Sequence, residues 1–407
     1  MSRILVIGGG IAGSAAALGL HKAGFEVSVA EAHPDTGADI GAFLTLASNG
    51  MRALAQLDAA EPVAELGFPL TTMSVIDEGG RQLATVPLGE RDHALTRYRC
   101  LRRADLGAAL RREVHRRGIP IRHAARLVTV TESSTGVTAA FADGTSATAD
   151  LLVGADGLHS TVRGQLDPGA PRPDYAGQSV FYGYTTDAEP PADEPSERIT
   201  MVRGSGAAFG YAFSPTGETF WFARVPGPAV TPEEAAGTTP SQWRSRLVPL
   251  LRPDRTPAAD IVAATADRLM VTNALHLSPG TRWRGRRTVL IGDAAHAASP
   301  ATGQGASMAL EDAVVLAKAL RDADSPTAAL ERYELLRRPR AERNITVSAQ
   351  LTASRGTAGA AAPSPSPSPA AAAPPARDSE RPAERVGEDL LRLLDWDTPL
   401  PEAGPDA

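Results

Sequence analysis

Three glycines near the N-terminus have the spacing that a bound dinucleotide requires. They follow an apolar run as Gly8, Gly10 and Gly13. Gly8 permits a tight turn, Gly10 leaves room for a pyrophosphate to approach the backbone, and Gly13 allows the next helix to pack closely on the strand. Ala12 lies in the same turn. Because the N–H groups at the start of a helix bind phosphate, this loop predicts a nucleotide site.

The sequence on either side of this loop predicts a βαβ unit. Residues 4–7 are a continuous apolar run typical of a buried strand, residues 11–23 are a helix of small residues, and FEVSVAEA is the next strand. Glu31 ends that second strand. Its carboxylate can accept hydrogen bonds from the ribose of an adenosine and would repel the 2′-phosphate of NADP. Strand, helix and terminal acid together favour a dinucleotide site over an ordinary glycine-rich loop.

Two later segments also end an apolar strand in a polar turn. In DLLVGADGLHSTVR, residues 150–163, the strand is followed by Asp156. Its carboxylate has two interpretations: it contacts a cofactor, or it caps the next turn with Arg163 as its ion-pair partner. In VLIGDAAHAASPATGQGASMALEDAVVLAKAL, residues 289–320, the strand ends in Gly-Asp, and a glycine-rich turn precedes a helix over 306–320.

Together these three segments resemble the fingerprints of the class A flavoprotein monooxygenases, the family of para-hydroxybenzoate hydroxylase, salicylate hydroxylase and tetracycline-inactivating hydroxylases. The resemblance covers about residues 3–345. It implies noncovalent FAD, with the Asp293 carboxylate on the ribityl chain and Pro300 beside the isoalloxazine. It also implies that the glycine-rich turn and the following helix start face the pyrimidine edge of the flavin, where they would stabilise negative charge. The residues so assigned in the third segment are Gly292, Asp293, Gly303, Gln304, Gly305 and Ala306.

The chain departs from the family pattern at two places near the flavin. It has Ser48-Asn49 where relatives often have Pro-Asn, and Ser307 where Asn is commoner. The second departure implies the loss of one side-chain contact to the flavin ring.

An arginine-rich helix follows CLRR at residues 100–103. Its apolar face predicts burial of one side, and we expect the opposite side to be solvated. Arg103 precedes this helix at the position of the family's FAD-contacting arginine, and Arg102 is the competing assignment. The arginines expected on the solvated side are Arg111, Arg112, Arg116 and Arg117.

The resemblance also implies a reaction. NAD(P)H, docking transiently, would reduce FAD, and O2 would form a flavin C4a-hydroperoxide that hydroxylates or epoxidises an electron-rich aromatic, polycyclic or alkene small molecule. The chain contains no second GxGxxG for a nicotinamide cofactor, and NADH and NADPH are not distinguished. The alternatives are a flavin-dependent reductase of the prenyl-reductase type and a redox-inert FAD-binding scaffold.

Short alternating and aromatic runs between residues 170 and 285 predict an antiparallel sheet that forms a substrate domain. Tyr182 and Tyr184 share one strand face, and Phe209, Tyr211 and Phe213 share another. Either set could wall an apolar cavity over the flavin, and core packing is an equally good interpretation for each aromatic.

We therefore predict an α/β fold, with a Rossmann-like FAD-binding domain, an interleaved antiparallel substrate domain and C-terminal helices. The expected regions are 1–169 for FAD binding with a substrate-domain insertion within about 65–100, 170–285 for the substrate domain, 286–350 for the third FAD motif and helices, 351–385 for a disordered Pro/Ala/Ser-rich linker, and 386–407 for a short amphipathic segment.

Composition excludes several other classes of protein. The net charge of -6 gives no general attraction to nucleic acid, and no apolar run is long enough to span a membrane. The N-terminus does not resemble a signal peptide, so we expect a cytoplasmic enzyme. Cys100 is the only cysteine, which excludes a disulfide, and no histidine spacing predicts a metal site. The sequence does not indicate an oligomeric state.

Overall fold

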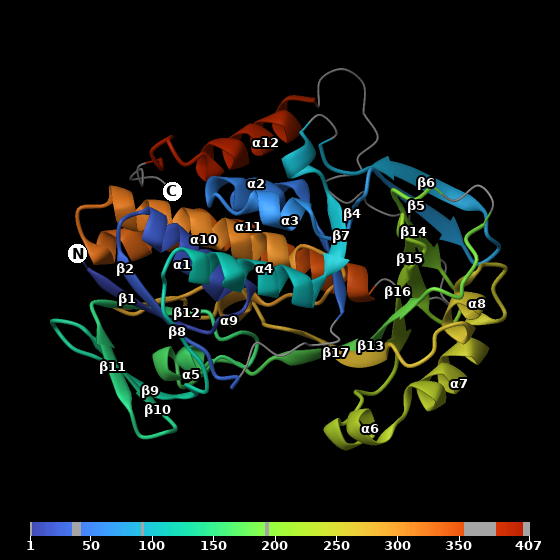
Figure 1. The fold of residues 1–407 in the computed structure, drawn as a ribbon, viewed down its shortest axis with the longest axis horizontal. Coiled ribbons are helices and arrows are strands. Elements are labelled where there is room, and N and C mark those ends of the chain that lie inside the picture. Colours follow the sequence, from blue (N-terminus) through green and yellow to red (C-terminus); the bar gives the residue numbers. More distant parts are fainter. Residues whose placement is uncertain (1, 35–41, 91–92, 192–194, 354–379, 402–407) are drawn as a thin grey trace.

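The computed structural model describes residues 2–34, 42–90, 93–191, 195–353 and 380–401. Two large sheets lie toward opposite ends of an elongated molecule, with helices stacked over the sheet that contains the N-terminus (Figure 1). This arrangement confirms the predicted α/β fold with an interleaved antiparallel sheet and C-terminal helices.

The first sheet has five parallel strands in the order β18-β12-β1-β2-β8. Residues 4–7 are almost fully buried because β1 pairs with a strand on each side. Helix α1 is rich in alanine, and its Gly19 lies where a Cβ would come within 3.1 Å of the Ala313 carbonyl, so the helix can pack closely on α10. The strands are β1 (Arg3–Ile7), β2 (Glu26–Ala30), β8 (Ile121–Arg122), β12 (Leu151–Gly154) and β18 (Thr288–Leu290).

Helices cover this sheet and connect its strands. The predicted helices over 11–23 and 306–320 are confirmed as α1 and α10, each within a few residues of the expected ends. The helices of this half are α1 (Ile11–Lys22), α2 (Ser48–Gln56), α3 (Ala60–Ala64), α4 (Arg103–Arg116), α5 (Thr161–Leu166), α9 (Asp293–His296), α10 (Gly305–Asp322) and α11 (Pro326–Ala353), with a 3-10 turn at η1 (Ala94–Thr96).

Two small antiparallel sheets flank the parallel one. The order β11-β10-β9 forms a surface meander, and β3-β7-β4 lies between the parallel sheet and the second large sheet. Their strands are β3 (Phe43–Leu46), β4 (Phe68–Pro69), β7 (Arg99–Arg102), β9 (Leu127–Glu132), β10 (Val137–Phe141) and β11 (Ser146–Ala149).

The second large sheet has seven strands in the order β17-β13-β16-β15-β14-β5-β6. Its strands pair antiparallel except β14 with β5, which pair parallel. β5 and β6 come from the N-terminal third of the chain. The strands are β5 (Thr72–Asp77), β6 (Gln82–Pro87), β13 (Asp174–Thr185), β14 (Arg198–Arg203), β15 (Ala208–Phe213), β16 (Thr219–Pro226) and β17 (Leu269–His276); the helices beside them are α6 (Pro232–Gly237), α7 (Pro240–Leu251) and α8 (Ala258–Ala263).

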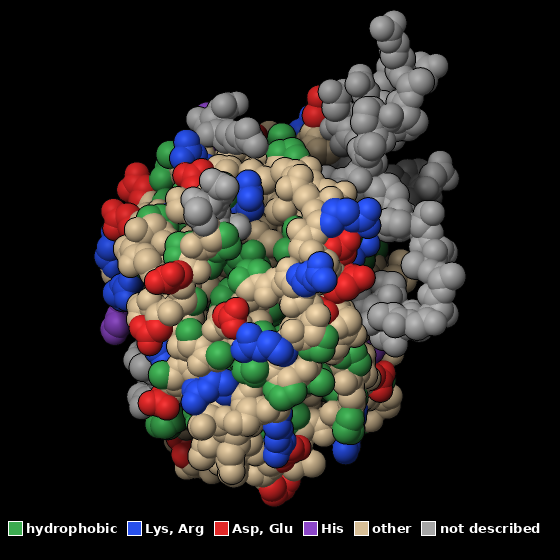
Figure 2. Space-filling view, turned by 90° about the vertical axis from the view of Figure 1, so that its right-hand side faces the viewer, with side chains coloured by type: hydrophobic (Ala, Val, Ile, Leu, Met, Phe, Trp, Pro, Cys, Tyr) green, Lys and Arg blue, Asp and Glu red, His purple; other side chains and the backbone are tan. Residues whose placement is uncertain are grey.

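The end of the molecule that includes α8 and β6 carries acidic and basic side chains interspersed with apolar ones (Figure 2). Some of these charges pair locally, as Arg252 does with Asp260 and Arg81 with Asp77. Within the described residues, no helix combines the length and apolar character that crossing a membrane requires.

The C-terminal segment returns to the half of the molecule that contains the parallel sheet. Helix α12 (Glu380–Leu394) lies over α2 and α10, so it begins inside the region expected to be a linker; α11 also extends into that region, and residues 354–379 lie outside the described residues. The fully buried Lys318 donates hydrogen bonds to the carbonyls of Arg392, Leu393 and Asp395 at 3.5, 2.8 and 2.5 Å. A lysine therefore caps the C-terminal end of α12, where an ammonium is favoured.

We predict that Lys318→Met detaches this segment. Methionine retains an apolar stem but leaves the three carbonyls without their donor, which should lower the free energy of unfolding by about 2 kcal/mol or more. Hydrogen exchange of residues 387–400 should accelerate strongly. Arg112→Met on the exposed side of α4 is the matched control. Unchanged exchange in the Lys318 variant would contradict a role for this cap.

Candidate active site

A cavity of about 970 Å³ lies between the two large sheets. The carboxyl ends of β1, β2, β12 and β18 supply one side of it, and β13, β14, β16 and β5 supply the other. Ligands of open parallel sheets bind beyond the carboxyl ends of the strands. The cavity therefore combines the expected nucleotide position with a chamber under the antiparallel sheet.

The three N-terminal glycines have different structural roles. Gly8 has a φ of +102°, and a Cβ there would lie 2.4 Å from the Ala155 carbonyl oxygen. A Cβ on Gly13 would lie 1.8 Å from the Gly8 carbonyl oxygen. A Cβ on Gly10 would meet no atom within 4 Å, although Gly10 lines the cavity. The chain itself requires glycine at the first and third positions, whereas the space at Gly10 suits an approaching pyrophosphate.

Glu31 lies at the rim of this glycine loop, as predicted from its place at the end of β2. Its Oε2 accepts a hydrogen bond from the Gly9 N–H at 2.6 Å, and its Oε1 accepts one from the His33 N–H at 2.8 Å. The carboxylate is held at the cavity wall, where an adenosine ribose would lie.

Asp156 caps helix α5. Its carboxylate accepts hydrogen bonds from the Ser160 hydroxyl at 2.5 Å and from the N–H groups of Thr161 and Val162 at 2.7 and 3.1 Å. Burial raises the pKa of this carboxyl, and these hydrogen bonds oppose the rise. Arg163 donates instead to the carbonyls of Leu158 and Ala294. Asp156 therefore has the predicted capping role, and it also lines the cavity.

The third predicted segment reaches the cavity through part of its residues. Asp293 begins α9 directly after β18 and lines the cavity. So do Ala12 in the first loop and a set from the third segment, Pro300, Gly303, Gly305 and Ala306. Gly292 and Gln304 do not line it. Gly292 has a φ of +57°, and a Cβ there would lie 2.9 Å from the Ala12 Cβ, so this glycine lets the two loops approach each other.

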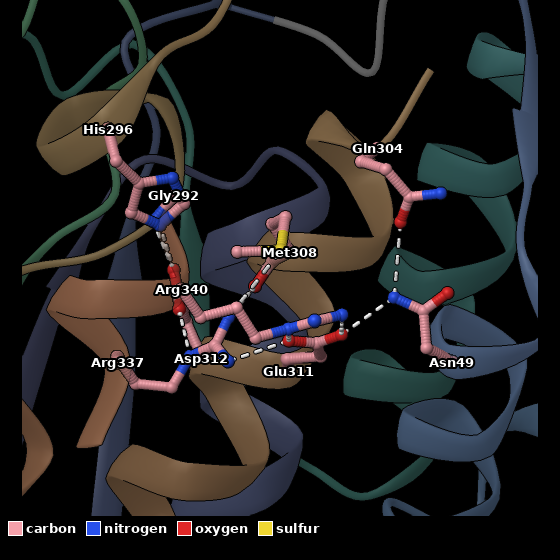
Figure 3. A network of polar contacts seen from close by, with 9 residues as sticks. All are labelled: Asn49, Gly292, His296, Gln304, Met308, Glu311, Asp312, Arg337 and Arg340. Carbon is pink, nitrogen blue, oxygen red and sulfur yellow. Dashed lines mark hydrogen bonds and ion pairs between the residues drawn. The ribbon is translucent and has the colours of Figure 1, made fainter. Parts of the chain in front are cut away.

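A network of buried charged side chains that do not line the cavity holds this segment in place (Figure 3). Asp312 on α10 accepts hydrogen bonds from the Gly292 N–H at 2.9 Å, the His296 ring at 2.5 Å and the Arg337 Nε at 2.8 Å. Glu311 accepts one from the Arg337 Nη1 at 2.6 Å. Asp312, Glu311 and Arg337 have no exposed side-chain surface.

The network continues to the first turn of α2. Arg340 makes two hydrogen bonds to Glu311, each 2.8 Å long. The Asn49 amide donates to Glu311 at 2.6 Å and to the Gln304 side chain at 3.2 Å. Ser307, also fully buried, accepts a hydrogen bond from the Ala47 N–H at 3.3 Å. Asn49, Gln304 and Ser307 therefore hold the glycine-rich turn against α2 and do not themselves line the cavity.

Burial and charge shift the pKa values of this network in opposite directions. Burial opposes ionisation of Asp312, but His296 and Arg337 outweigh it and lower its pKa to about 2. Burial also opposes protonation of His296, but the Asp312 carboxylate outweighs it and raises the imidazole pKa. The pair is therefore more strongly ionic in the folded chain than its separate groups would be.

The arginines near α4 differ from expectation at two positions. Arg117 was expected on the solvated side, but its side chain is only 11% exposed and donates hydrogen bonds to the Leu57 and Asp58 carbonyls. Arg103 lines the cavity, and the competing Arg102 forms an ion pair with Glu218 at 2.5 Å and lies over the Tyr184 ring. Arg111 also lines the cavity, so the prediction that it belongs to the solvated side was wrong. Arg103, Gly107 and Arg111 recur every four residues and share one helix face, a spacing that could have revealed the position of Arg111.

The predicted aromatic sets lie on opposite faces of the seven-stranded sheet. Phe209, Tyr211 and Phe213 pack with Trp221 and Trp243 in the core under α7 and α8, so they do not wall the cavity. Strand alternation causes this, because every second residue of β15 points to the helix-covered face. On the other face, Tyr182 lines the cavity, while Tyr184 packs against Phe43 and Phe220 without lining it.

Sequence reasoning missed several other residues of the cavity. Arg224 follows Phe222 on the cavity face of β16, and no motif marked it. The remaining missed residues with a polar or large apolar side chain include Phe43, Thr45, Met73, Tyr98, His123, Arg126, Ile199 and Met201. Among the residues that the structure describes, no group of three or more His, Cys, Asp or Glu could hold a metal ion.

Comparisons with known proteins agree with this geometry. The family model of an FAD-binding domain matches residues 1–348. The chain is 36% identical over 355 residues to 3-amino-4-hydroxybenzoate 2-monooxygenase PtmB3 of Streptomyces platensis, covering 83% of this chain and 84% of that protein. It is 31% identical over 340 residues to an FAD-dependent urate hydroxylase of Klebsiella pneumoniae, covering 82% and 85%. The structure of Klebsiella pneumoniae HpxO complexed with FAD and uric acid superposes with a TM-score of 0.77 at 27% identity, covering 88% of this chain and 89% of that one.

The contrast between Gly10 and Gly13 gives a direct test of the nucleotide loop. Gly10→Val should weaken FAD binding by about tenfold or more, because its side chain would occupy the space for the pyrophosphate. The melting temperature of its apoprotein should stay near that of the wild type. Gly13→Ala should instead destabilise the apoprotein by roughly 2 kcal/mol or more, since its Cβ meets backbone. Wild-type FAD affinity in Gly10→Val, measured by flavin fluorescence, would contradict the assignment.

The raised His296 pKa predicts a pH-dependent contribution to stability. Its pair with Asp312 should stabilise the fold fully below the unfolded pKa of about 6.5 and lose this effect as pH rises through the folded-state value. The difference in urea midpoint between wild-type apoprotein and His296→Gln should therefore shrink from about pH 6 to about pH 9. Asp312 stays ionised across this range, so the change reports the imidazole. A constant difference would show that His296 does not change charge there.

Proposed function

The chain belongs to the FAD-binding family of class A flavoprotein monooxygenases, and from that premise we propose that it hydroxylates an electron-rich aromatic ring held in the chamber between the two large sheets. It is an FAD-dependent enzyme. NAD(P)H is the reductant that the family uses. The observation that carries the proposal is the continuity of one cavity from the glycine loop to the apolar face of the antiparallel sheet.

The residues of the nucleotide half suit FAD. Gly10 leaves the space, Glu31 presents a fixed carboxylate, and Arg103 lies at the start of α4 on the cavity wall. We assign Asp293 to the ribityl chain, and the turn at Gly303 to the flavin edge. The remaining assigned contacts are Gly8, Ala12, Asp156, Gly305 and Ala306, while Gly13, Gly292 and Gln304 hold the loops that carry them.

The residues of the other half suit an aromatic substrate. The relatives are named for an aminohydroxybenzoate and for urate, which are planar ring compounds. The side chains of the sheet that line the chamber are apolar apart from Tyr182 and Arg224. Phe43 of β3 packs against Tyr182 with the two rings perpendicular. Flat apolar walls bind a ring and exclude water.

Bound FAD, once reduced, supplies the electrons that activate O2. The balanced reaction is ArH + O2 + NAD(P)H + H⁺ → ArOH + H2O + NAD(P)⁺, in which one oxygen atom enters the new C–O bond and the other leaves as water. The protein orients the ring toward the Pro300 loop and keeps bulk water from the chamber, which suppresses release of hydrogen peroxide. No nucleophilic side chain is required.

Isotope labelling tests this function. With 18O2 and NADH or NADPH, we expect a hydroxylated aromatic product that carries one 18O atom, detected by mass spectrometry. Asp293→Ala should lower its yield at limiting FAD, because FAD affinity should fall by about 1.5 to 3 kcal/mol.

Two other outcomes would overturn the proposal. An alkene that is saturated by NAD(P)H without O2 consumption would identify a reductase of the prenyl-reductase type. Bound FAD that NAD(P)H does not reduce with any ring compound present would identify a redox-inert scaffold.

A further inference from the structure

Two hydroxyl side chains meet at the cavity wall beside the glycine-rich turn. The Tyr98 phenol donates a hydrogen bond to the Thr45 Oγ1 at 3.2 Å, and both residues line the cavity. Thr45 lies on β3, and Tyr98 directly precedes β7, the strand that pairs with β3. The pair therefore belongs to the small sheet between the two large ones (Figure 1).

The Thr45 hydroxyl lies against the turn at Gly303. This glycine has a φ of +66°, and a Cβ there would come within 3.2 Å of the Thr45 Oγ1. Two residues after Thr45, the Ala47 N–H donates a hydrogen bond to the Ser307 hydroxyl at 3.3 Å, which fixes the end of β3 against the start of α10. The hydroxyl is therefore held, with no side chain from position 303 crowding it, where we assign the flavin edge.

The hydrogen of the Thr45 hydroxyl lacks an acceptor among the described residues. The hydroxyls of Ser299 and Thr302 also lie near this turn and line the cavity, but both form hydrogen bonds to α11. The Thr45 oxygen accepts a hydrogen bond from Tyr98, and a hydroxyl that accepts one still has its own hydrogen to donate. Thr45 therefore offers a hydrogen-bond donor to a ligand in the cavity.

The phenol of Tyr98 strengthens this donor. Burial raises the pKa of Tyr98, so the phenol stays protonated at neutral pH. Because hydrogen bonds in a chain polarise one another, donation by Tyr98 makes the Thr45 hydroxyl a better donor. A strong donor favours an acceptor that gains negative charge. The pyrimidine edge of a flavin is such an acceptor, since reduction places negative charge on it.

We propose that the Thr45 hydroxyl, oriented by Tyr98, donates a hydrogen bond to the pyrimidine edge of FAD and stabilises the reduced cofactor more than the oxidised one. The inference rests on the proposed position of the flavin edge at Gly303, and it adds two side chains that set the reduction potential. Thr45 makes the contact, and Tyr98 is a positioning residue. Together they make reduction of FAD by NAD(P)H more favourable.

Reduction potentials of the FAD-loaded enzyme test the proposal, measured by equilibration with a reference dye and without any ring compound. Thr45→Val has nearly the same shape without the hydroxyl. Its affinity for reduced FAD relative to oxidised FAD should fall about tenfold, which makes the potential about 30 mV more negative for a two-electron couple. Thr45→Ser should keep the wild-type potential. Tyr98→Phe should shift the potential in the same direction, and combining it with Thr45→Val should add no further shift.

Two variants outside the cavity are matched controls. Thr71→Val removes a hydroxyl that donates to the Glu197 carbonyl, and Tyr175→Phe removes a phenol that donates to the Gly227 carbonyl. Neither side chain lines the cavity, so both potentials should stay at the wild-type value. If Thr45→Val does not retain FAD, Tyr98→Phe decides the outcome.

The outcomes distinguish this inference from the proposed function. A wild-type potential in Thr45→Val or in Tyr98→Phe overturns the inference, even if a ring is hydroxylated with 18O2. An equal shift in Thr45→Ser and Thr45→Val also overturns it, because serine keeps the hydroxyl. A wild-type potential with weaker binding of a ring compound would assign the hydroxyl to the substrate instead. The expected shifts without any labelled product leave the hydrogen bond to FAD intact and overturn only the proposed hydroxylation.

Discussion

The fully buried carboxylate of Asp312 is the contact on which the geometry of the cofactor half depends. It joins α10, the Gly-Asp turn after β18 and α11 by accepting hydrogen bonds from Gly292, His296 and Arg337. Desolvation offsets much of the Coulombic attraction in such a network, so its net contribution to stability is modest, but removing one partner leaves an uncompensated buried charge. What the network provides is an anchor for the turn that presents Asp293 to the cavity, through the bond from the Gly292 N–H to Asp312.

The interleaved chain order explains why one cavity can serve two kinds of ligand. The parallel sheet presents its strand ends, which suit a nucleotide, and the seven-stranded sheet presents a face, which suits a flat ring. Because β5 and β6 precede α4 in the chain but pair in the second sheet, neither half is a contiguous segment. The walls of the chamber are thereby fixed to the cofactor loops by several crossings of the chain rather than by a single linker.

Much of the cofactor half could be predicted from sequence because its signals are local. The loop at Gly8–Gly13, the acid at Glu31 and the helix after Gly305 each depend on residues within a few positions of one another. The choice between Arg102 and Arg103 depends on one step of the chain. Arg102 pairs with Glu218, just before β16, whereas Arg103 lines the cavity, and neither feature can be read from the local sequence. The repeat that brings Arg111 to the cavity was present in the sequence, but the neighbouring arginines concealed it.

The substrate half was less predictable because its faces are set by distant pairing. Alternation correctly grouped Phe209 with Tyr211 and Phe213, yet it could not say which face of the sheet α7 and α8 would cover. The same limit concealed Arg224, which resembles any strand arginine until Pro300 is placed beside it.

The segment from Gly292 to Asp312 is where these constraints meet. Its first residue is held by Asp312, its Pro300 carbonyl accepts a hydrogen bond from Arg224 of the seven-stranded sheet, and Gln304 accepts one from Asn49 in the first turn of α2. The turn is consequently a junction between the two walls of the cavity, fixed at its start by α10, at Pro300 by the seven-stranded sheet and at Gln304 by α2.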